Sequence, residues 1–232
     1  MAEASPAQGA ALPLLEARGL AAVQGTSYVL LDLDLRVSAG ERVAIAGANG
    51  TGKSTLLGLL AGHRAPDAGQ LRWRGVDVQA LDPRQLQRRV GWLGHQPGLL
   101  LALSARENLI LFAELAGCDA SAARIDAVLD AVGLDSADRQ RPVATYSRGM
   151  TQRAGLGRLM AVGAELWLLD EPTTGLDTDG RARLDSALGL HQRRGGALVV
   201  VSHDEAQWLA ADRVLWLQQG RLRNQPAPKA AA

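Results

Sequence analysis

Short apolar runs alternate with amphipathic segments along this chain of 232 residues. The runs at 42–46, 166–169 and 197–201 are almost unbroken in their apolar character, which is typical of strands buried on both faces of a parallel sheet. Residues 28–37 instead alternate apolar and polar side chains, which predicts a half-buried antiparallel strand. Further short strands are predicted at 71–74 and 90–93, and a closing hairpin at 214–217 and 221–223.

Helices are predicted from capping residues and from apolar residues three or four positions apart. Asp82 and Pro83 open a short helix to about Arg89, and Ser104 with Glu107 forms a capping box. Two more helices are predicted: one through 125–132 that stops at a glycine, and one after residue 147. The order of elements indicates an α/β fold whose mainly parallel sheet is interrupted by a helical insert of about fifty residues.

Residues 47–55, which we call the P-loop, are predicted to form a glycine-rich turn between the strand at 42–46 and a helix that begins near Ser54. In the spacing Gly-x-x-x-x-Gly-Lys-Ser, the glycines let backbone N–H groups turn inward around an anion. Lys53 adds a compact cation where a planar guanidinium would be too wide, and the helix N-terminus attracts phosphate. The predicted nucleotide-phosphate site, with Ser54 as an Mg²⁺ ligand, comprises Gly47, Ala48, Asn49, Gly50, Thr51, Gly52, Lys53, Ser54 and Thr55.

Charge and composition narrow the class of protein. The formal net charge is +1 and 21% of residues are charged, so nucleic acid is not an expected partner. Only Lys53 and Lys229 are lysines among 25 basic residues, so the P-loop lysine stands out. A single cysteine, Cys118, excludes an internal disulfide or a cysteine metal cluster.

The ends of the chain are predicted to be loose at 1–13 and 225–232, around one domain at 14–224. The first twelve residues contain Glu3 and no basic residue, and they do not resemble a signal peptide. No run approaches the roughly 18 apolar residues that a membrane-spanning helix needs. We therefore expect a chain that does not span a membrane by itself but is able to dock on one.

Two acids, Asp170 and Glu171, follow the apolar run at 166–169 and therefore lie at the carboxyl end of a predicted strand. In nucleotide hydrolases the first such acid holds the Mg²⁺ shell, and the second orients or deprotonates an attacking water. An acidic pair after a strand is often only an exposed turn. Downstream of a P-loop, it predicts a metal ligand and a catalytic base.

Other polar residues also follow predicted strands or open a helix. Gln96 is predicted to reach the metal or the water through its amide, and His203 to contact the γ-phosphate as a neutral imidazole. Ser147 and Gly149 open a helix whose N-terminus either binds phosphate or is simply capped. The remaining histidines are interpreted as packed or surface residues: His63, His95 and His191.

These motifs, in this order, resemble the ATP-binding subunits of ABC transporters, over about 15–223 of the chain. The resemblance implies a P-loop NTPase core of mainly parallel sheet, an antiparallel β-subdomain, and a helical subdomain at about 97–160. It implies ATP and Mg²⁺ as cofactors, integral membrane transporter subunits as partners, and a peripheral location on the cytoplasmic face of the inner membrane. It also implies a head-to-tail dimer in which the signature segment of one protomer closes the ATP site of the other.

The same resemblance assigns a role to each matching residue. Lys53 and Ser54 hold phosphates and Mg²⁺, and Asp170 supports the metal. Glu171 is the catalytic base and His203 the switch. Gln96 is assigned as a γ-phosphate sensor and metal ligand near the docking site of the membrane partner. Ser147 and Gly149 are γ-phosphate ligands in trans. Asp177 crosses the dimer interface.

Two features depart from the family pattern. The usual signature is Leu-Ser-Gly-Gly-Gln, whereas Arg148 here replaces the first glycine and Met150 the glutamine. Family members usually stack an aromatic residue on adenine from a segment corresponding to 21–23, and none is present there. Tyr28 is the nearest aromatic residue but is displaced along the sequence.

Within the family, residues 15–20, the stretch 92–98 and the short span from Gln96 to Ser147 resemble haem-exporter subunits of cytochrome c maturation. The signature Tyr-Ser-Arg-Gly-Met also occurs in general multidrug and polysaccharide exporters, which stay open as alternatives. A non-transport ABC ATPase is less favoured, because the chain has neither a second nucleotide domain nor a long coiled coil. The absence of Asn-Lys-x-Asp argues against a GTPase, and the retention of Glu171 argues against a purely regulatory module.

Overall fold

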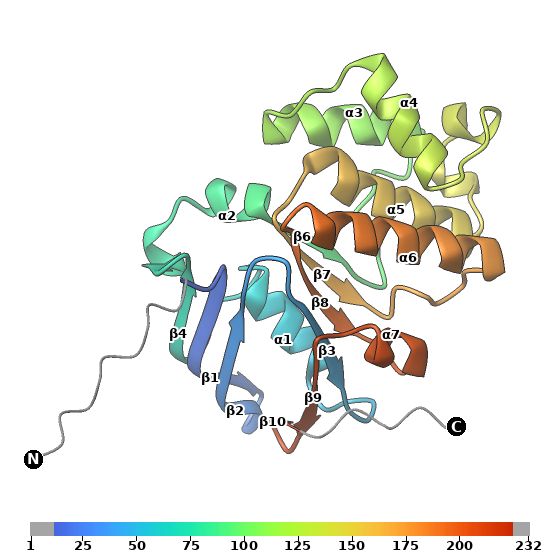
Figure 1. Ribbon diagram of the computed structural model, residues 1–232. Coiled ribbons are helices and arrows are strands. Elements are labelled where there is room, and N and C mark those ends of the chain that lie inside the picture. Colours follow the sequence, from blue (N-terminus) through green and yellow to red (C-terminus); the bar gives the residue numbers. More distant parts are fainter. Residues whose placement is uncertain (1–11, 225–232) are drawn as a thin grey trace, which may run out of the picture.

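The computed structural model describes residues 12–224, so the predicted loose termini fall almost wholly outside the described residues (Figure 1). The strands are β1 (Leu15–Gln24), β2 (Ser27–Val37), β3 (Arg42–Ala46), β4 (Ala68–Trp73), β5 (Val76–Asp77), β6 (Val90–Leu93), β7 (Leu166–Asp170), β8 (Ala197–Val201), β9 (Arg213–Gln218) and β10 (Arg221–Asn224). The α-helices are α1 (Lys53–Leu60), α2 (Pro83–Arg89), α3 (Ala105–Ala116), α4 (Ala122–Ala131), α5 (Arg148–Val162), α6 (Thr178–Arg193) and α7 (Glu205–Leu209). Single 3₁₀ turns lie at Val78–Ala80, Asp138–Gln140 and Val143–Thr145.

The larger sheet has the strand order β10-β9-β3-β8-β7-β6, and it is parallel except for the closing hairpin of β9 and β10. The predicted apolar runs are its central strands, and each buries both faces. In β8, Val199 and Val201 pack in the apolar cluster that contains α1, whereas Leu198 and Val200 pack in the cluster that contains α5 and α6. This division explains why the run has no polar alternation.

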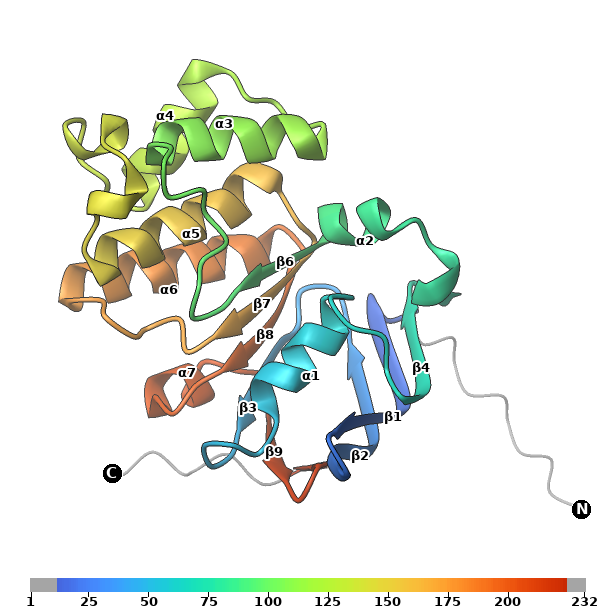
Figure 2. The same cartoon turned by 180° about the vertical axis from the view of Figure 1, so that it is seen from behind.

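A second, antiparallel sheet has the order β2-β1-β4-β5 and covers α1 from the side away from the parallel sheet (Figures 1 and 2). Leu56, Leu57 and Leu60 of α1 are fully buried in a cluster with residues of both sheets. A backbone hydrogen bond from Leu31 N–H to the Gly220 carbonyl (2.8 Å) ties β2 to the β9–β10 hairpin. The predicted α/β fold class, a P-loop core with an antiparallel subdomain, is therefore confirmed.

The alternating strand predicted at 28–37 is β2, but its alternation is interrupted. Asp32 has a positive φ of 51°, and the pairing of β2 with β1 shifts in register between the Leu20–Leu33 and Ala22–Leu30 pairs. Leu31 is consequently only half-buried, whereas Leu30 and Leu33 are buried. The regular inward and outward pattern holds only beyond this bulge.

Helices α3, α4 and α5 fill the segment between β6 and β7, where the sequence predicts a helical subdomain (Figure 2). The predicted capping box is present, since the Ser104 backbone N–H donates to Glu107 Oε2 (2.8 Å) and the Glu107 N–H donates to Ser104 Oγ (3.2 Å). Helix α4 ends before Gly133, whose φ is 71°. The boundaries at 97 and 160 stay a prediction, because α5 shares one apolar cluster with the sheet as well as with α3 and α4.

The connection from β6 into this helical segment lies directly on α5. Arg158 donates through Nη2 to the Trp92 carbonyl (2.7 Å) and through Nε to the Pro97 carbonyl (3.2 Å). A Cβ on Gly155 would lie 2.5 Å from Pro97 Cβ and 2.7 Å from Leu93 Cδ1. The close approach of the connection to α5 therefore requires a glycine at 155.

Membrane-spanning helices are not found in the part of the chain that the structure describes, because none of its helices has the necessary length and apolar character.

A pair of glycine substitutions tests this packing. Gly155 and Gly58 both lie inside helices, but a Cβ on Gly58 would meet its nearest neighbour, Trp92 Cη2, at an ordinary 3.8 Å. Both changes to alanine gain the same helix propensity, so their difference reports the overpacking at Gly155. We expect the free energy of unfolding of Gly155→Ala to lie about 1–3 kcal/mol below that of Gly58→Ala. Urea denaturation measures both values, and equal stabilities would contradict the proposed close packing.

Candidate nucleotide-binding site

The carboxyl ends of β3, β6, β7 and β8 meet at one edge of the parallel sheet, where ligands of such sheets bind. A cleft of about 650 Å³ opens at this edge. Its wall comes from P-loop residues and from the segments that follow β6, β7 and β8. The contributions from these three segments are His95, Asp170, Glu171, Thr174 and His203.

The P-loop is shaped by glycines whose conformation and surroundings both exclude a side chain. Gly47 has φ 151°, and a Cβ there would lie 2.6 Å from the Leu217 carbonyl oxygen. Gly52 has φ 99°, and its Cβ would lie 2.6 Å from Val29 Cγ1. Helix α1 begins directly afterwards at Lys53, so its free N–H groups face the cleft edge.

The Lys53 ammonium lies within the loop. Its Nζ donates to the carbonyls of Gly47 and Ala48, both at 2.8 Å, and the residue is 8% exposed although it lines the cleft. An ammonium has three donors, so one remains for a phosphate oxygen. The loop carbonyls therefore hold the cation in place beside the expected position of the β- and γ-phosphates.

Ser54 and Asp170 form a pair of oxygen ligands that fits Mg²⁺. Ser54 Oγ donates to Asp170 Oδ2 at 2.7 Å, and Asp170 is 4% exposed at the end of β7. A hydroxyl, a carboxylate and phosphate oxygens are the hard ligands that Mg²⁺ takes when it is bound beside a nucleotide. The predicted metal ligands Ser54 and Asp170 are thus brought together from distant parts of the sequence.

Glu171 and His203 lie next to each other across the ends of β7 and β8. The Glu171 backbone is held at φ 50°, and its Oε1 is buried with no hydrogen-bond partner among residues 12–224. The His203 N–H donates to Glu171 Oε2 (3.4 Å), and His203 Nε2 lies 3.5 Å from Glu171 Oε1 and 3.1 Å from Asn49 Oδ1. Glu171 lines the cleft, and a carboxylate oxygen without a hydrogen-bond partner is suited to accept a proton from water.

The residues predicted to act in trans do not line this cleft. Ser147 caps α5 by accepting the Met150 N–H (3.3 Å), and Asp177 caps α6 by accepting the Gly180 N–H (2.8 Å). A Cβ on Gly149 would lie 2.7 Å from the Gly175 carbonyl oxygen, so α5 begins in contact with the loop that leads to Asp177. Their contacts with a second protomer stay a prediction.

Comparison with known proteins identifies the family. A family model described as ABC transporter matches residues 30–174. The chain belongs to the ABC transporter family. It is 42% identical over 192 residues to the cytochrome c biogenesis ATP-binding export protein CcmA of Cupriavidus necator, which covers 83% of this chain and 84% of that protein. The CcmA protein of Pseudomonas aeruginosa is 38% identical, over 83% of this chain and 94% of its own.

Solved ABC structures have the same fold. A dimeric post-hydrolysis ATP-binding cassette bound to ADP and Pi has a TM-score of 0.83 at 25% identity, covering 92% of this chain and 99% of that chain. An ATP-binding subunit of an ABC transporter has a TM-score of 0.84 at 26% identity, covering 92% and 90% of the two chains. The layers of the present chain are those of an ABC cassette.

The segment after β6 contributes a histidine to the cleft lining. Gln96 is exposed and does not line the cleft of this ABC cassette, whereas its neighbour His95 does. His95 is exposed, which agrees with its interpretation as a surface residue, and it also lies at the nucleotide edge. The metal and γ-phosphate roles of Gln96 stay a prediction without support from its position.

Two residues of the antiparallel sheet also line the cleft. Gln24 and Val29, from β1 and β2, line it, and Tyr28 is 63% exposed and outside the lining. This agrees with the expectation that Tyr28 is displaced. The antiparallel sheet therefore contributes an aliphatic side chain and an amide to the cleft, rather than an aromatic ring.

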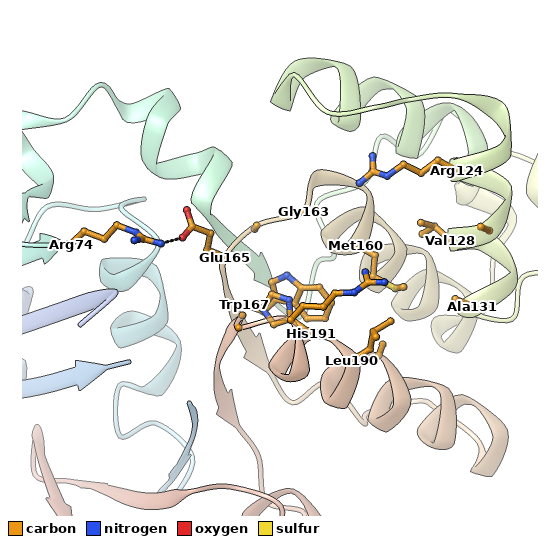
Figure 3. Close-up of a pocket in the computed structure, with 16 residues that line it drawn as sticks. Arg74, Arg124, Val128, Ala131, Met160, Gly163, Glu165, Trp167, Leu190 and His191 are labelled. Carbon is orange, nitrogen blue, oxygen red and sulfur yellow. Dashed lines mark hydrogen bonds and ion pairs between the residues drawn. The ribbon is translucent and has the colours of Figure 1, made fainter. Parts of the chain in front are cut away.

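A second cleft of about 670 Å³ lies at the amino ends of β7 and β8, between α4, α5 and α6 (Figure 3). Here the ring of His191 stacks on Trp167 with centroids 4.0 Å apart, and burial lowers the pKa of His191. Glu165 is paired with Arg74 and Arg89. The His191 contacts agree with its interpretation as a packed residue, and the P-loop opens at the other end of the sheet.

Removal of the P-loop cation tests the site directly. We expect Lys53→Ala to weaken ATP binding about 10- to 100-fold, because it loses a hydrogen bond between two charged groups. The matched control is Arg84→Ala, which removes an exposed cation on α2 far from the lining residues. Titration with a fluorescent ATP analogue measures both affinities, and an unchanged affinity in Lys53→Ala would place the phosphates elsewhere.

Proposed function

We propose that the chain is the ATP-binding and hydrolysing subunit of the haem exporter of c-type cytochrome maturation. It acts as a peripheral subunit on the cytoplasmic face of the inner membrane. The observation that carries the proposal is one cleft lined by the P-loop, the Asp170–Glu171 pair and His203, in a chain 42% identical to a protein named for cytochrome c biogenesis export. ATP is the substrate, and ADP and phosphate are the products.

Hydrolysis follows from the positions of the side chains. Lys53 and the P-loop N–H groups bind the β- and γ-phosphates and hold the terminal phosphorus in place. The buried Oε1 of Glu171 accepts a proton from the attacking water, and His203, 3.5 Å away, is placed to contact the γ-phosphate. Ser54 and Asp170 would hold Mg²⁺, which neutralises negative charge on the phosphates when it is bound.

A head-to-tail dimer completes each site. Ser147 and Gly149 lie at the N-terminus of α5, a helix end suited to a phosphate, yet they are outside the cleft of their own chain. Asp177 lies on the neighbouring loop, which Gly149 contacts through the Gly175 carbonyl. We infer that this joined surface meets the γ-phosphate bound by a second protomer.

Apolar residues near the helical segment supply a docking face for the membrane partner. Leu100, Leu101 and Leu115 are 48%, 58% and 63% exposed. Leu100 and Leu101 follow the connection from β6 directly along the chain, and Leu115 lies near the end of α3. Burial of such side chains by integral membrane transporter subunits would couple hydrolysis to transport.

A general multidrug or polysaccharide exporter is the second candidate, because the signature Tyr-Ser-Arg-Gly-Met is shared with those subunits. Such an exporter would hydrolyse ATP with the same residues and the same dimer. The two candidates differ in the cargo of the membrane partner, so only the phenotype of a nucleotide-site variant separates them. A non-transport ATPase ranks below both, since the formal net charge of +1 gives no indication of a nucleic-acid partner.

Replacing the proposed base tests hydrolysis and dimerisation together. Glu171→Gln keeps the phosphate ligands but removes the proton acceptor, so we expect ATP binding to persist, turnover to fall by at least about 100-fold, and an ATP-bound dimer to accumulate. Glu205→Gln, the same change on exposed α7, serves as the control. Phosphate release and size-exclusion chromatography with ATP provide the measurements. A monomer that ignores ATP in Glu171→Gln would refute the sandwich dimer.

A cellular experiment tests the proposed cargo. Cells whose copy of the gene is replaced by the Lys53→Ala allele are expected to lose c-type cytochromes selectively, because the exporter can no longer bind its nucleotide. A haem-stained gel of their membranes measures this, with the wild-type copy restored as the control. Normal haem staining would overturn the haem assignment and leave the general exporter.

A further inference from the structure

We propose that the second cleft, between α4, α5 and α6, binds a small organic anion with an apolar body. Its volume is about 670 Å³, against about 650 Å³ for the nucleotide cleft. Both volumes lie in the range of about 300–1,000 Å³ that is common for small-molecule sites. Glu165 and Gly196, which directly precede β7 and β8, line it, so it lies at the opposite end of these strands from the P-loop. The site is therefore distinct from the nucleotide cleft and does not depend on the proposed function.

The floor and walls of the cleft are largely apolar. Trp167 and Val128 are buried, whereas Met160 and Leu190 are half-buried and so remain partly accessible. These side chains come from β7, α4, α5 and α6 and lie around one space (Figure 3). The stacked rings of Trp167 and His191, at an interplanar angle of 13°, form a rigid part of the wall. The apolar body of a ligand would leave water on entering this space, which favours binding.

Two arginines beside this apolar space select for a negative group. Arg124 donates to the Asp119 backbone carbonyl and has no carboxylate within ion-pair distance among residues 12–224. The Asp119 carboxylate instead accepts hydrogen bonds from the N–H and the hydroxyl of Ser121, at 2.8 Å and 3.0 Å. Arg194, exposed at the end of α6, has no side-chain hydrogen bond and no ion pair in the described part of the chain. Both guanidiniums are therefore available to a carboxylate, sulfonate or phosphate of a ligand.

The other charges around the cleft do not reverse this preference. Glu165, the only acid that lines the cleft within residues 12–224, is paired with Arg74 and Arg89. Burial lowers the pKa of His191, so its imidazole is neutral at pH 7. The C-terminal ends of α5 and α6 each contribute the equivalent of about half a negative charge. Three lining arginines, set against one glutamate and these two helix ends, leave the cleft with a net charge of about +1.

Small residues keep the cleft open to solvent. Gly163 and Gly195 line it, and a Cβ on either would meet nothing within 4 Å. Ala127 and Ala131, one turn apart on α4, line another side and are exposed. No side chain larger than a methyl group is present at these four positions, so a ligand can enter from solvent.

Binding of 8-anilinonaphthalene-1-sulfonate tests the site, because this aromatic sulfonate becomes fluorescent when its rings leave water. The purified full chain is titrated with the dye in the presence of saturating ADP, so that the nucleotide cleft is occupied. We expect saturable binding of the dye. Inorganic sulfate at the same concentration is not expected to displace it, because sulfate lacks the apolar body.

Two matched pairs of variants locate the bound dye. Arg193 and Arg194 are both exposed, but only Arg194 lines the cleft, and the exposed alanines Ala123 and Ala127 of α4 differ in the same way. We expect Arg194→Gln to raise the dissociation constant of the dye about 3- to 5-fold, the size of one exposed ion pair, and Arg193→Gln to leave it unchanged. Ala127→Glu narrows the cleft and adds a negative charge, so it weakens binding more than Ala123→Glu. Thermal unfolding of each variant checks that it is folded.

Three results would overturn the inference. The first is a wild-type chain that does not bind the dye when ADP is saturating, and the second is displacement of the dye by an equal concentration of sulfate. The third is the same dissociation constant for both members of either pair of variants. None of these results bears on the proposed function, which the Lys53→Ala and Glu171→Gln variants test separately.

Discussion

The parallel pairing of β3, β8 and β7 is the constraint on which the site depends. Ile45 pairs with Val201, and Val201 pairs with Asp170, so the three strands end at one level. This register sets the P-loop, the acidic pair and His203 beside one another although they lie far apart in sequence. It brings Ser54 Oγ within 2.7 Å of Asp170 Oδ2, and a slip of one residue would turn the acid to the other face.

The same strands also organise the packing. Alternate residues of β7 and β8 enter two separate apolar clusters, one around α1 and one around α5 and α6. The phosphate loop therefore rests on one core and the signature helix on the other, with the sheet between them. Because the β6 connection is held on α5 at Pro97, the segment that carries His95 to the nucleotide edge is in direct contact with the helical segment.

Much of this arrangement was predictable from local patterns, and the misses have physical causes. The buried strands, the capping box at Ser104 and the P-loop depend on short-range chemistry that sequence spacing records. Strand β1 was missed because register shifts break its alternation, and α6 because its buried face is limited to a few residues around Leu184 and Leu188. His95 has no motif of its own, and its place in the cleft lining depends on the path of the connection after β6. Roles across a dimer depend on a second chain and lie beyond any single-chain pattern.

The close contact between Gly149 and Gly175 has a consequence for how such sequences evolve. A Cβ at 149 would meet the Gly175 carbonyl at 2.7 Å, and Arg148 covers Gly175, whose φ is 79°. Selection for a folded protein alone will retain both glycines, even in a descendant that has stopped hydrolysing ATP. The Glu171 carboxylate makes no such close contact, since its neighbours are the N–H and ring of the exposed His203, at 3.4 Å and 3.5 Å. In a descendant that is no longer selected for ATP hydrolysis, we therefore expect substitutions at Glu171 before substitutions at Gly149, because the fold still requires the glycine.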